Sequence, residues 1–176
     1  MIAEPEFSRP VRVGSLPPGG RTYAIEAKPD ERAALAKRFD LISLDSLKAT
    51  LRLRPVGRQV RLEGDLSAEV TQRCVVTLEP IEATVEERFE MCYAEGEGDE
   101  DERFSERDIV VEYEGEDVPD PIVGGMIDIG EAVAEHLALA LDPFPRKPEA
   151  RFTGVEEEGD ERSPFAVLKS LERKSD

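Results

Sequence analysis

The sequence predicts an α+β fold: an antiparallel β meander forming a partly open, barrel-like sheet, with two or three short helices. The main observation is an alternation of apolar and polar residues that recurs from residue 46 to residue 93, with turn residues between the segments. A second observation is a set of apolar residues at helical spacing in residues 128–140. Strands joined by short turns, apolar on one face and polar on the other, are typical of an antiparallel sheet with one face in solvent.

The chain of 176 residues is long enough for one domain with its own core and for additional peripheral segments. We expect residues 1–145 to form a single α+β domain and residues 146–176 to form an extended linker that ends in a short helix. Within the domain, residues 94–107 are dominated by acidic residues and offer little to bury. They therefore predict a disordered acidic loop.

Charge is distributed unevenly along the chain. The net charge of −17 comprises +3 over residues 1–75 and −20 over residues 76–176. This asymmetry suggests two surfaces with different partners. The overall field repels nucleic acid at long range, so RNA binding requires a local basic patch, whereas an acidic surface favours a basic protein. Solubility alone is an equal explanation of the acidic excess.

The N-terminal part predicts two short strands and a helix. Residues 7–13 read as an edge strand, because Pro10 would interrupt a central ladder, and residues 23–27 read as a second strand. A helix is expected over residues 31–38 with Asp30 as its N-cap, because acidic residues come first and basic residues last. The residues expected to face the core are Ala33, Ala34 and Leu35.

The central part predicts the meander itself. Strands are expected at residues 46–55, 59–63, 66–74 and 81–93. The turns between the first three are expected at Val56-Gly57 and Gly64-Asp65. The inward positions of the first strand are Leu47, Ala49, Leu51 and Leu53.

Three further elements are expected downstream. Residues 108–113 predict a strand that returns to the sheet, and residues 128–140 predict a helix with Asp128 as its N-cap and Glu131 completing a capping box. Pro164 suits the first position of a terminal helix, which is too short to be stable alone. We expect it to dock on its own domain or on a partner through Phe165, Leu168 and Leu171.

The sequence does not suggest catalysis, a metal site or a cofactor. The single histidine, His136, reads as a helix-surface or boundary residue. Together with Cys74 and Cys92 it gives too few ligands for a structural zinc site, and two cysteines are too few for a disulfide framework. No glycine-rich phosphate loop occurs. We therefore expect a non-enzymatic binding protein, and we expect the cytoplasm as its location because no targeting or membrane segment is visible.

Arginines on the outward face of the meander are the candidate RNA-binding residues. Arg52 and Arg54 alternate with inward leucines, and Arg61 projects from the next strand. Arg58 lies near the turn, and Arg73 joins the group if the third strand pairs alongside. Arginine binds phosphate oxygens in pairs, so the patch suits RNA, although the absence of interleaved aromatic residues argues against base stacking. The alternative interpretation is an ordinary solvent-exposed face on which these arginines pair with Glu63, Glu69 and Glu82.

Three segments, in order, resemble the YceD family. They are residues 71–80 (TQRCVVTLEP), residues 126–143 (MIDIGEAVAEHLALALDP) and residues 163–168 (SPFAVL), the last close to the family's terminal Asn-Pro-Phe-Ala-x-Leu pattern. The resemblance extends over about residues 7–172 and is strongest to the alphaproteobacterial branch. Many members have Cys-x-x-Cys where this chain has Thr71 and Cys74, so a metal or redox role of that pair does not transfer.

The resemblance implies a role in the accumulation of large-subunit ribosomal RNA, and thus in large-subunit biogenesis. It supplies no catalytic residues. The expected partner is large-subunit RNA or a pre-large-subunit particle, and the alternative is an escort for a basic large-subunit ribosomal protein.

Overall fold

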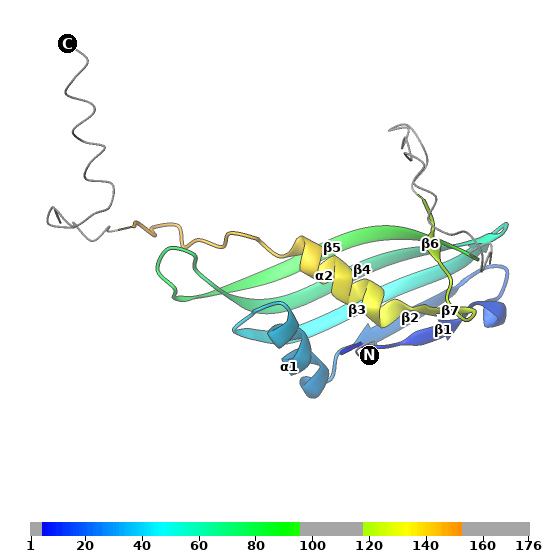
Figure 1. The fold of residues 1–176 in the computed structure, drawn as a ribbon, viewed down its shortest axis with the longest axis horizontal. Helices are drawn as coiled ribbons and strands as arrows, with labels where there is room; N and C mark the ends of the chain where they lie inside the picture. The colour runs from blue at the N-terminus through cyan, green and yellow to red at the C-terminus, as the bar shows by residue number, and fades with distance from the viewer. Residues whose placement is uncertain (1–4, 96–117, 153–176) are drawn as a thin grey trace, which may run out of the picture.

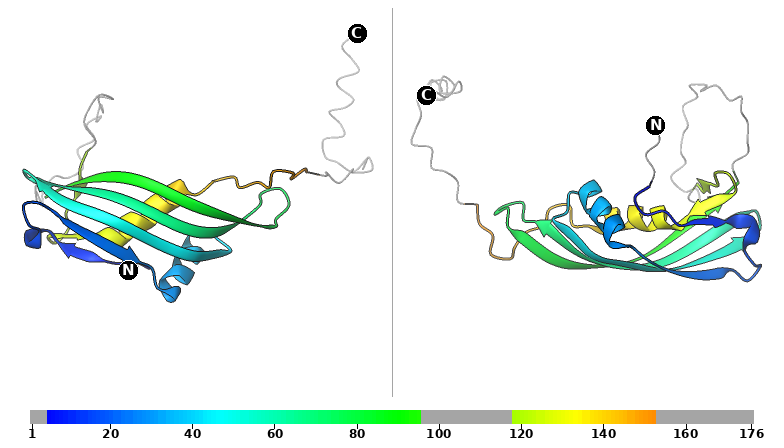
Figure 2. Two further views of the ribbon diagram at one scale, coloured as in Figure 1. Left: turned by 180° about the vertical axis from the view of Figure 1, so that it is seen from behind. Right: turned by 90° about the horizontal axis from the view of Figure 1, so that it is seen from below.

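The computed structural model describes residues 5–95 and 118–152 and has two layers (Figure 1). One layer is a five-stranded sheet with the order β2-β3-β4-β5-β6, and the other holds two helices and a two-stranded sheet, β1-β7. Both helices lie on the same face of the large sheet, and the opposite face carries none of the described elements (Figure 2). We call this opposite face the bare face. Within the described ranges the sheet stays open, and the predicted α+β class is confirmed.

The large sheet is the predicted antiparallel meander. Its strands are β2 (Arg21–Glu26), β3 (Ser43–Val56), β4 (Gln59–Arg73), β5 (Pro80–Ala94) and β6 (Asp120–Pro121). β2 to β5 are antiparallel neighbours in chain order, and β6 returns parallel to the last two residues of β5. The remaining elements are β1 (Pro10–Arg12), η1 (Val13–Ser15), α1 (Pro29–Arg38), β7 (Met126–Asp128) and α2 (Ile129–Ala140).

The core lies between the large sheet and the helices. The predicted inward positions of β3, Leu47, Ala49, Leu51 and Leu53, are all buried. They pack in one cluster with buried residues of β4 and both helices. Burying a leucine side chain stabilises a fold by about 1.5–3 kcal/mol, so this alternation accounts for the choice of inner face.

The predicted turn at Gly64-Asp65 is wrong, because β4 runs without interruption through both residues. Gly64 is buried opposite Phe89 of β5. A Cβ at Gly64 would lie 2.5 Å from the Phe89 Cζ, so the missing side chain makes room for the aromatic ring. The glycine thus serves packing within a strand, where the missing side chain allows a close approach.

α1 begins earlier than predicted, and its cap differs. Lys28 is the N-cap, Pro29 occupies the first helical position and Asp30 lies inside the first turn, so the expected Asp30 cap is wrong. The Glu31 carboxylate accepts a hydrogen bond from the Lys28 N–H at 2.7 Å. The core-facing set is also shifted: Leu35 is buried as expected with Ala36, whereas Ala33 is exposed and Ala34 is half-buried.

α2 confirms the helix predicted after Asp128. The Asp128 carboxylate accepts hydrogen bonds from the N–H groups of Gly130 at 3.0 Å and Glu131 at 3.2 Å, as an N-cap does. It also accepts from the Arg9 N–H at 2.7 Å and from the Ser8 hydroxyl, which fastens the N-terminal segment to the helix. Glu131 makes an ion pair with Arg38 of α1 at 2.8 Å.

Three predictions fall outside the described residues. They are the predicted acidic loop (residues 94–107) from residue 96 onward, the strand at residues 108–113, and the terminal helix with its docking residues Phe165, Leu168 and Leu171. The first residue of the predicted loop, Ala94, instead belongs to β5. Each stays a prediction.

Candidate nucleic-acid interface

The hairpin between β3 and β4 positions most of the predicted arginines. Val56 pairs with Gln59, so the strands are joined by a two-residue turn of Gly57 and Arg58. Gly57 has φ 63°, a conformation that suits glycine at the first position of such a hairpin turn. The turn fixes the register of both strands, and with it the relative positions of the side chains on the bare face.

Four predicted arginines lie at this end of the sheet. Buried and exposed residues alternate along β3 and β4, and these arginines occupy exposed positions. Arg52 and Arg54 therefore leave β3 on the bare face, and Arg61 leaves β4 on the same face. The register places Arg54 directly opposite Arg61, and Arg52 opposite Glu63. Arg58 is exposed in the turn. We call Arg52, Arg54, Arg58 and Arg61 the arginine end.

Carboxylates neutralise little of the arginine end. The Arg61 Nε lies 2.8 Å from a Glu90 oxygen, in a pair whose side chains are 46% and 56% exposed. Pairs with that much exposure are weak. Among the described residues, Arg52, Arg54 and Arg58 make no ion pair, and the alternative pairing with Glu63, Glu69 and Glu82 is not formed there.

The facing pair Arg54 and Arg61 is unfavourable by itself. Like charges directly opposite each other on neighbouring strands are destabilising. A phosphate placed between two guanidinium groups would remove that repulsion and accept charge-assisted hydrogen bonds from both. The arrangement is therefore suited to an external anion.

Arg73 does not join the arginine end. It is the last residue of β4, at the opposite end of the continuous strand from Arg61. With a rise of about 3.3–3.4 Å per residue, the two arginines are roughly 40 Å apart along the strand. The expectation that Arg73 adds to the patch required a turn at Gly64-Asp65, and it fails with that turn.

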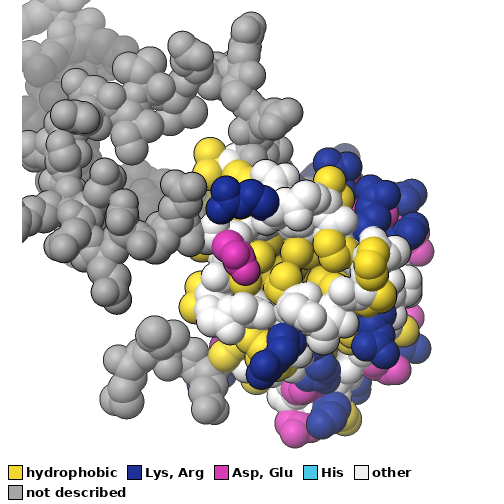
Figure 3. All heavy atoms as spheres, turned by 90° about the vertical axis from the view of Figure 1, so that its right-hand side faces the viewer, with side chains coloured by type: hydrophobic (Ala, Val, Ile, Leu, Met, Phe, Trp, Pro, Cys, Tyr) yellow, Lys and Arg dark blue, Asp and Glu magenta, His cyan; other side chains and the backbone are white. Residues whose placement is uncertain are grey.

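Arg21 does not add to the arginine end. β2 begins at Arg21, two residues before the predicted strand, and its register pairs Arg21 with the buried Leu53. Directly opposed residues of neighbouring strands lie on the same face, so Arg21 leaves β2 on the face that the helices cover, whereas Thr22, opposite Arg52, lies on the bare face. Figure 3 looks onto this end of the molecule and shows Lys and Arg side chains gathered along one side of it, next to hydrophobic side chains.

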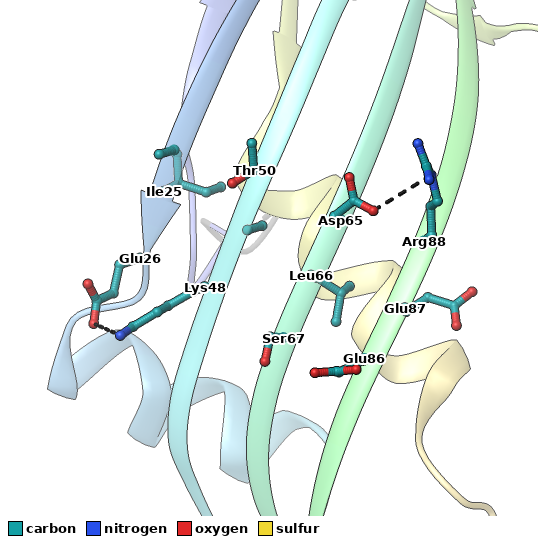
Figure 4. A pocket seen from close by; sticks show the side chains of 12 residues that line it. Ile25, Glu26, Lys48, Thr50, Asp65, Leu66, Ser67, Glu86, Glu87 and Arg88 are labelled. Carbon is teal, nitrogen blue, oxygen red and sulfur yellow. Dashed lines mark ion pairs between the residues drawn. The ribbon is translucent and has the colours of Figure 1, made fainter.

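The middle of the bare face has a shallow hollow of about 710 Å³ (Figure 4). Small side chains, Ala24, Thr50 and Ser67, form its floor. Two cross-strand ion pairs lie beside it, Glu26 with Lys48 at 3.8 Å and Asp65 with Arg88 at 3.6 Å. Glu86 and Glu87 also line the hollow, so its carboxylates outnumber its basic side chains and it does not favour an anion such as phosphate.

The opposite end of the sheet is organised around Cys74. This residue is fully buried in the turn after β4, where its sulfur accepts a hydrogen bond from the Thr77 N–H at 3.4 Å. The segment after α2 is fastened to the same turn: the Val75 N–H donates to the Pro145 carbonyl at 2.9 Å, and Lys147 makes an ion pair with Glu79 at 2.8 Å.

These contacts favour the thiolate form of Cys74. A hydrogen bond from the Thr77 side chain, helped by backbone N–H groups of Lys147 and Thr77, lowers the pKa of the Cys74 thiol from 9.0 to about 6. Thr71, three residues before Cys74, is buried. Cys74 thus accepts a hydrogen bond within the turn, and the Val75–Pro145 and Lys147–Glu79 contacts hold the segment after α2 against the same turn.

Within residues 5–95 and 118–152, no three acidic, histidine or cysteine side chains gather as a metal site requires. No helix in those ranges is long and apolar enough to cross a membrane.

Comparison with known proteins gives one match. The family model described as "Large ribosomal RNA subunit accumulation protein YceD" matches residues 62–172. The matched span contains the turn around Cys74 and α2, whereas the arginine end lies just before it. No curated protein and no solved structure matches the chain.

Proposed function

Because the chain belongs to the YceD family of large ribosomal RNA subunit accumulation proteins, we propose that it is a non-enzymatic factor in large-subunit biogenesis that binds large-subunit RNA through its arginine end. The RNA is bound free or within a pre-large-subunit particle, in the cytoplasm. In this function the protein supports accumulation of the 23S RNA without chemical change to it.

The observation that carries the proposal is the facing pair Arg54 and Arg61 beside two further arginines. Arg52, Arg54 and Arg58 are exposed and without a carboxylate partner among the described residues. Phosphate contacts of this kind supply affinity without reading sequence, and each one makes binding weaker as salt rises.

The overall charge of −17 fits this mode of binding. A protein of that charge is repelled by RNA at distances within the Debye length, about 8 Å at physiological salt. Contact is therefore restricted to the one orientation in which the arginine end faces the RNA. This restriction favours a defined docking position on a large particle over diffuse coating of RNA.

The test compares two triple variants with equal charge change. The test variant removes Arg52, Arg54 and Arg58, and the control variant removes Lys48, Arg73 and Arg88, in each case by alanine substitution. Binding of transcribed large-subunit RNA fragments is measured as a function of salt. For single-stranded contacts, each lost phosphate contact reduces the slope of log K against log salt by about 0.7, so the test variant should lose about 2.

The control variant should keep the wild-type slope, and unfolding in urea should show that both variants are folded. A test variant with the wild-type affinity and slope would refute the proposal. So would an equal loss in both variants, which would indicate general electrostatics without a defined interface.

A second candidate function is favoured by a different observation, the carboxylates along β5. Glu82, Glu86, Glu87 and Glu90 all lie on this strand at one edge of the sheet. In this function the protein is an acidic escort that shields a basic large-subunit ribosomal protein before assembly. Pull-down of one such protein without RNA would support the escort, and failure of purified basic ribosomal proteins to bind would refute it.

A further inference from the structure

β5 forms an edge of the large sheet over most of its length. Only its last two residues, Tyr93 and Ala94, are paired on the outer side, with β6. Figure 2 shows β5 along one edge of the large sheet, with the other long strands all on one side of it. From Pro80 to Cys92 the outer side of β5 has no strand partner among the described residues.

The hydrogen bonds at both ends of β5 show which backbone groups point outward. The Cys74 N–H donates to the Glu79 carbonyl, so odd-numbered residues of β5 pair with β4. The Ile122 N–H donates to the Ala94 carbonyl, so even-numbered residues face the outer side. Between these ends the outward-facing residues are Glu82, Thr84, Glu86, Arg88, Glu90 and Cys92.

These residues present a row of N–H and C=O groups over about 33 Å, from Glu82 to Cys92, at the spacing of a strand. The described residues supply no hydrogen-bond partner for them. An open row of this kind is a template for another extended chain, which adds to the sheet by main-chain hydrogen bonds.

The side chains on this edge determine which chain can add. Glu82, Glu86 and Glu90 are exposed on the bare face, and Glu87 projects from the other face. Figure 4 shows Glu87 extending from β5 away from β4. Arg88 is the single basic residue of β5, and it is engaged with Asp65 at 3.6 Å.

A second copy of this chain is a poor occupant. Antiparallel pairing of two β5 edges would bring glutamates from both copies next to one another, and like charges across strands are destabilising. Charged residues on edge strands are a common protection against self-association. The same carboxylates attract an extended segment in which lysine or arginine alternates with other residues.

We propose that the outer edge of β5 binds a Lys/Arg-rich extended segment of a partner protein by strand addition. Main-chain hydrogen bonds to the even-numbered residues supply the pairing, and the glutamates select basic side chains. The proposal rests on the second candidate function, a basic protein partner, and does not depend on RNA binding by the arginine end.

The test uses the full chain and a twelve-residue peptide in which lysine alternates with threonine. Amide hydrogen exchange is measured by NMR with and without the peptide. We expect the even-numbered amides from Glu82 to Cys92 to exchange fast in the free protein and at least tenfold more slowly with the peptide. The odd-numbered amides, already bonded to β4, serve as the internal check of folding.

Two variants separate strand addition from simple charge attraction. Thr84→Pro removes an outward N–H and leaves every side-chain charge in place, so it should weaken peptide binding at least tenfold; edge strands tolerate proline at such positions. Glu86→Lys should weaken binding to a similar extent. Glu26→Lys, on the opposite edge strand β2, is the matched control and should bind like the wild type.

The possible outcomes are distinct. Even-numbered amides that are protected in the free protein would show that another part of the chain or a second copy occupies the edge, and would overturn the proposal. Peptide binding that is unaffected by Thr84→Pro would overturn strand addition and leave the escort function standing. A chain that binds neither the peptide nor purified basic ribosomal proteins would overturn both.

Discussion

Replacing Gly64 by alanine is expected to destabilise the protein, although alanine suits a strand interior better than glycine. Gly64 is buried in β4 and lies opposite Phe89. A Cβ there would be 2.5 Å from the Phe89 Cζ, 2.6 Å from its Cε1 and 3.0 Å from a Leu51 methyl carbon. Non-bonded carbon atoms prefer about 3.5–4.0 Å, so the aromatic ring has to move.

The two opposing effects have known sizes. Glycine in the middle of a strand is less stable than alanine by about 0.5–1 kcal/mol, and an added methyl group in a packed core costs about 1–3 kcal/mol. The expected net loss for Gly64→Ala is about 1 kcal/mol. In a Phe89→Leu background the smaller side chain leaves room, so the same change should stabilise by about 0.5 kcal/mol.

Urea unfolding of the wild type, both single variants and the double variant measures this coupling, which should exceed about 1 kcal/mol. His136 provides a local readout, because its ring stacks on Phe89 at a centroid distance of 3.9 Å and its burial lowers its pKa. Displacement of Phe89 should raise that pKa toward 6.5. A Gly64→Ala variant as stable as the wild type, or strictly additive changes, would refute the packing role of Gly64.

Three further predictions concern the Cys74 thiol, the N-cap of α2 and the Arg9–Glu31 ion pair. Thiolate absorbance of the wild type should titrate with a pKa of about 6, and Cys74→Ser should lack this transition. Because folding lowers the pKa of the thiol, the stability advantage of the wild type over Cys74→Ser should be full above pH 9.0 and gone below about pH 6. A stability difference that does not change with pH would contradict this prediction. Asp128→Ala should lower the free energy of unfolding in urea by about 1–2 kcal/mol, because it removes the N-cap of α2; an unchanged value would show that the cap contributes nothing. Hydrogen bonds from Arg9 lower the pKa of the Glu31 carboxyl group. The Arg9–Glu31 pair should therefore stabilise the fold fully above pH 4.5 and lose this effect as the pH falls through the lowered pKa. In urea titrations at pH 3–6, Arg9→Ala should reduce this pH dependence of stability.

The sequence was sufficient to predict the parts of the fold that follow from local periodicity. Alternation places Leu47, Leu51 and Leu53 on one face of a strand, and burial of that face is the only arrangement that removes all of them from water. Asp128 could be identified as an N-cap because its carboxylate is suited to the N–H groups of the next turn, wherever the helix packs.

The sequence was insufficient where a residue type has two structural roles. Gly64 before Asp65 is a turn signal, but it is also what allows Phe89 to lie over β4, and only the partner strand distinguishes these roles. The position of Arg73 followed from the same choice, because a continuous β4 separates it from Arg61. Which arginines lie together could therefore not be predicted from the sequence alone, because it depends on the register between paired strands.

The central claim is that the arginine end contacts large-subunit RNA, and crosslinking in growing cells tests it most directly. Tagged protein is irradiated in the cells and purified, the attached RNA is sequenced, and the crosslinked peptides are identified. The claim predicts large-subunit RNA attached to the β3–β4 hairpin between Arg52 and Arg61. Crosslinks confined to the distant end near Arg73, or recovery of the protein without attached RNA, would contradict it.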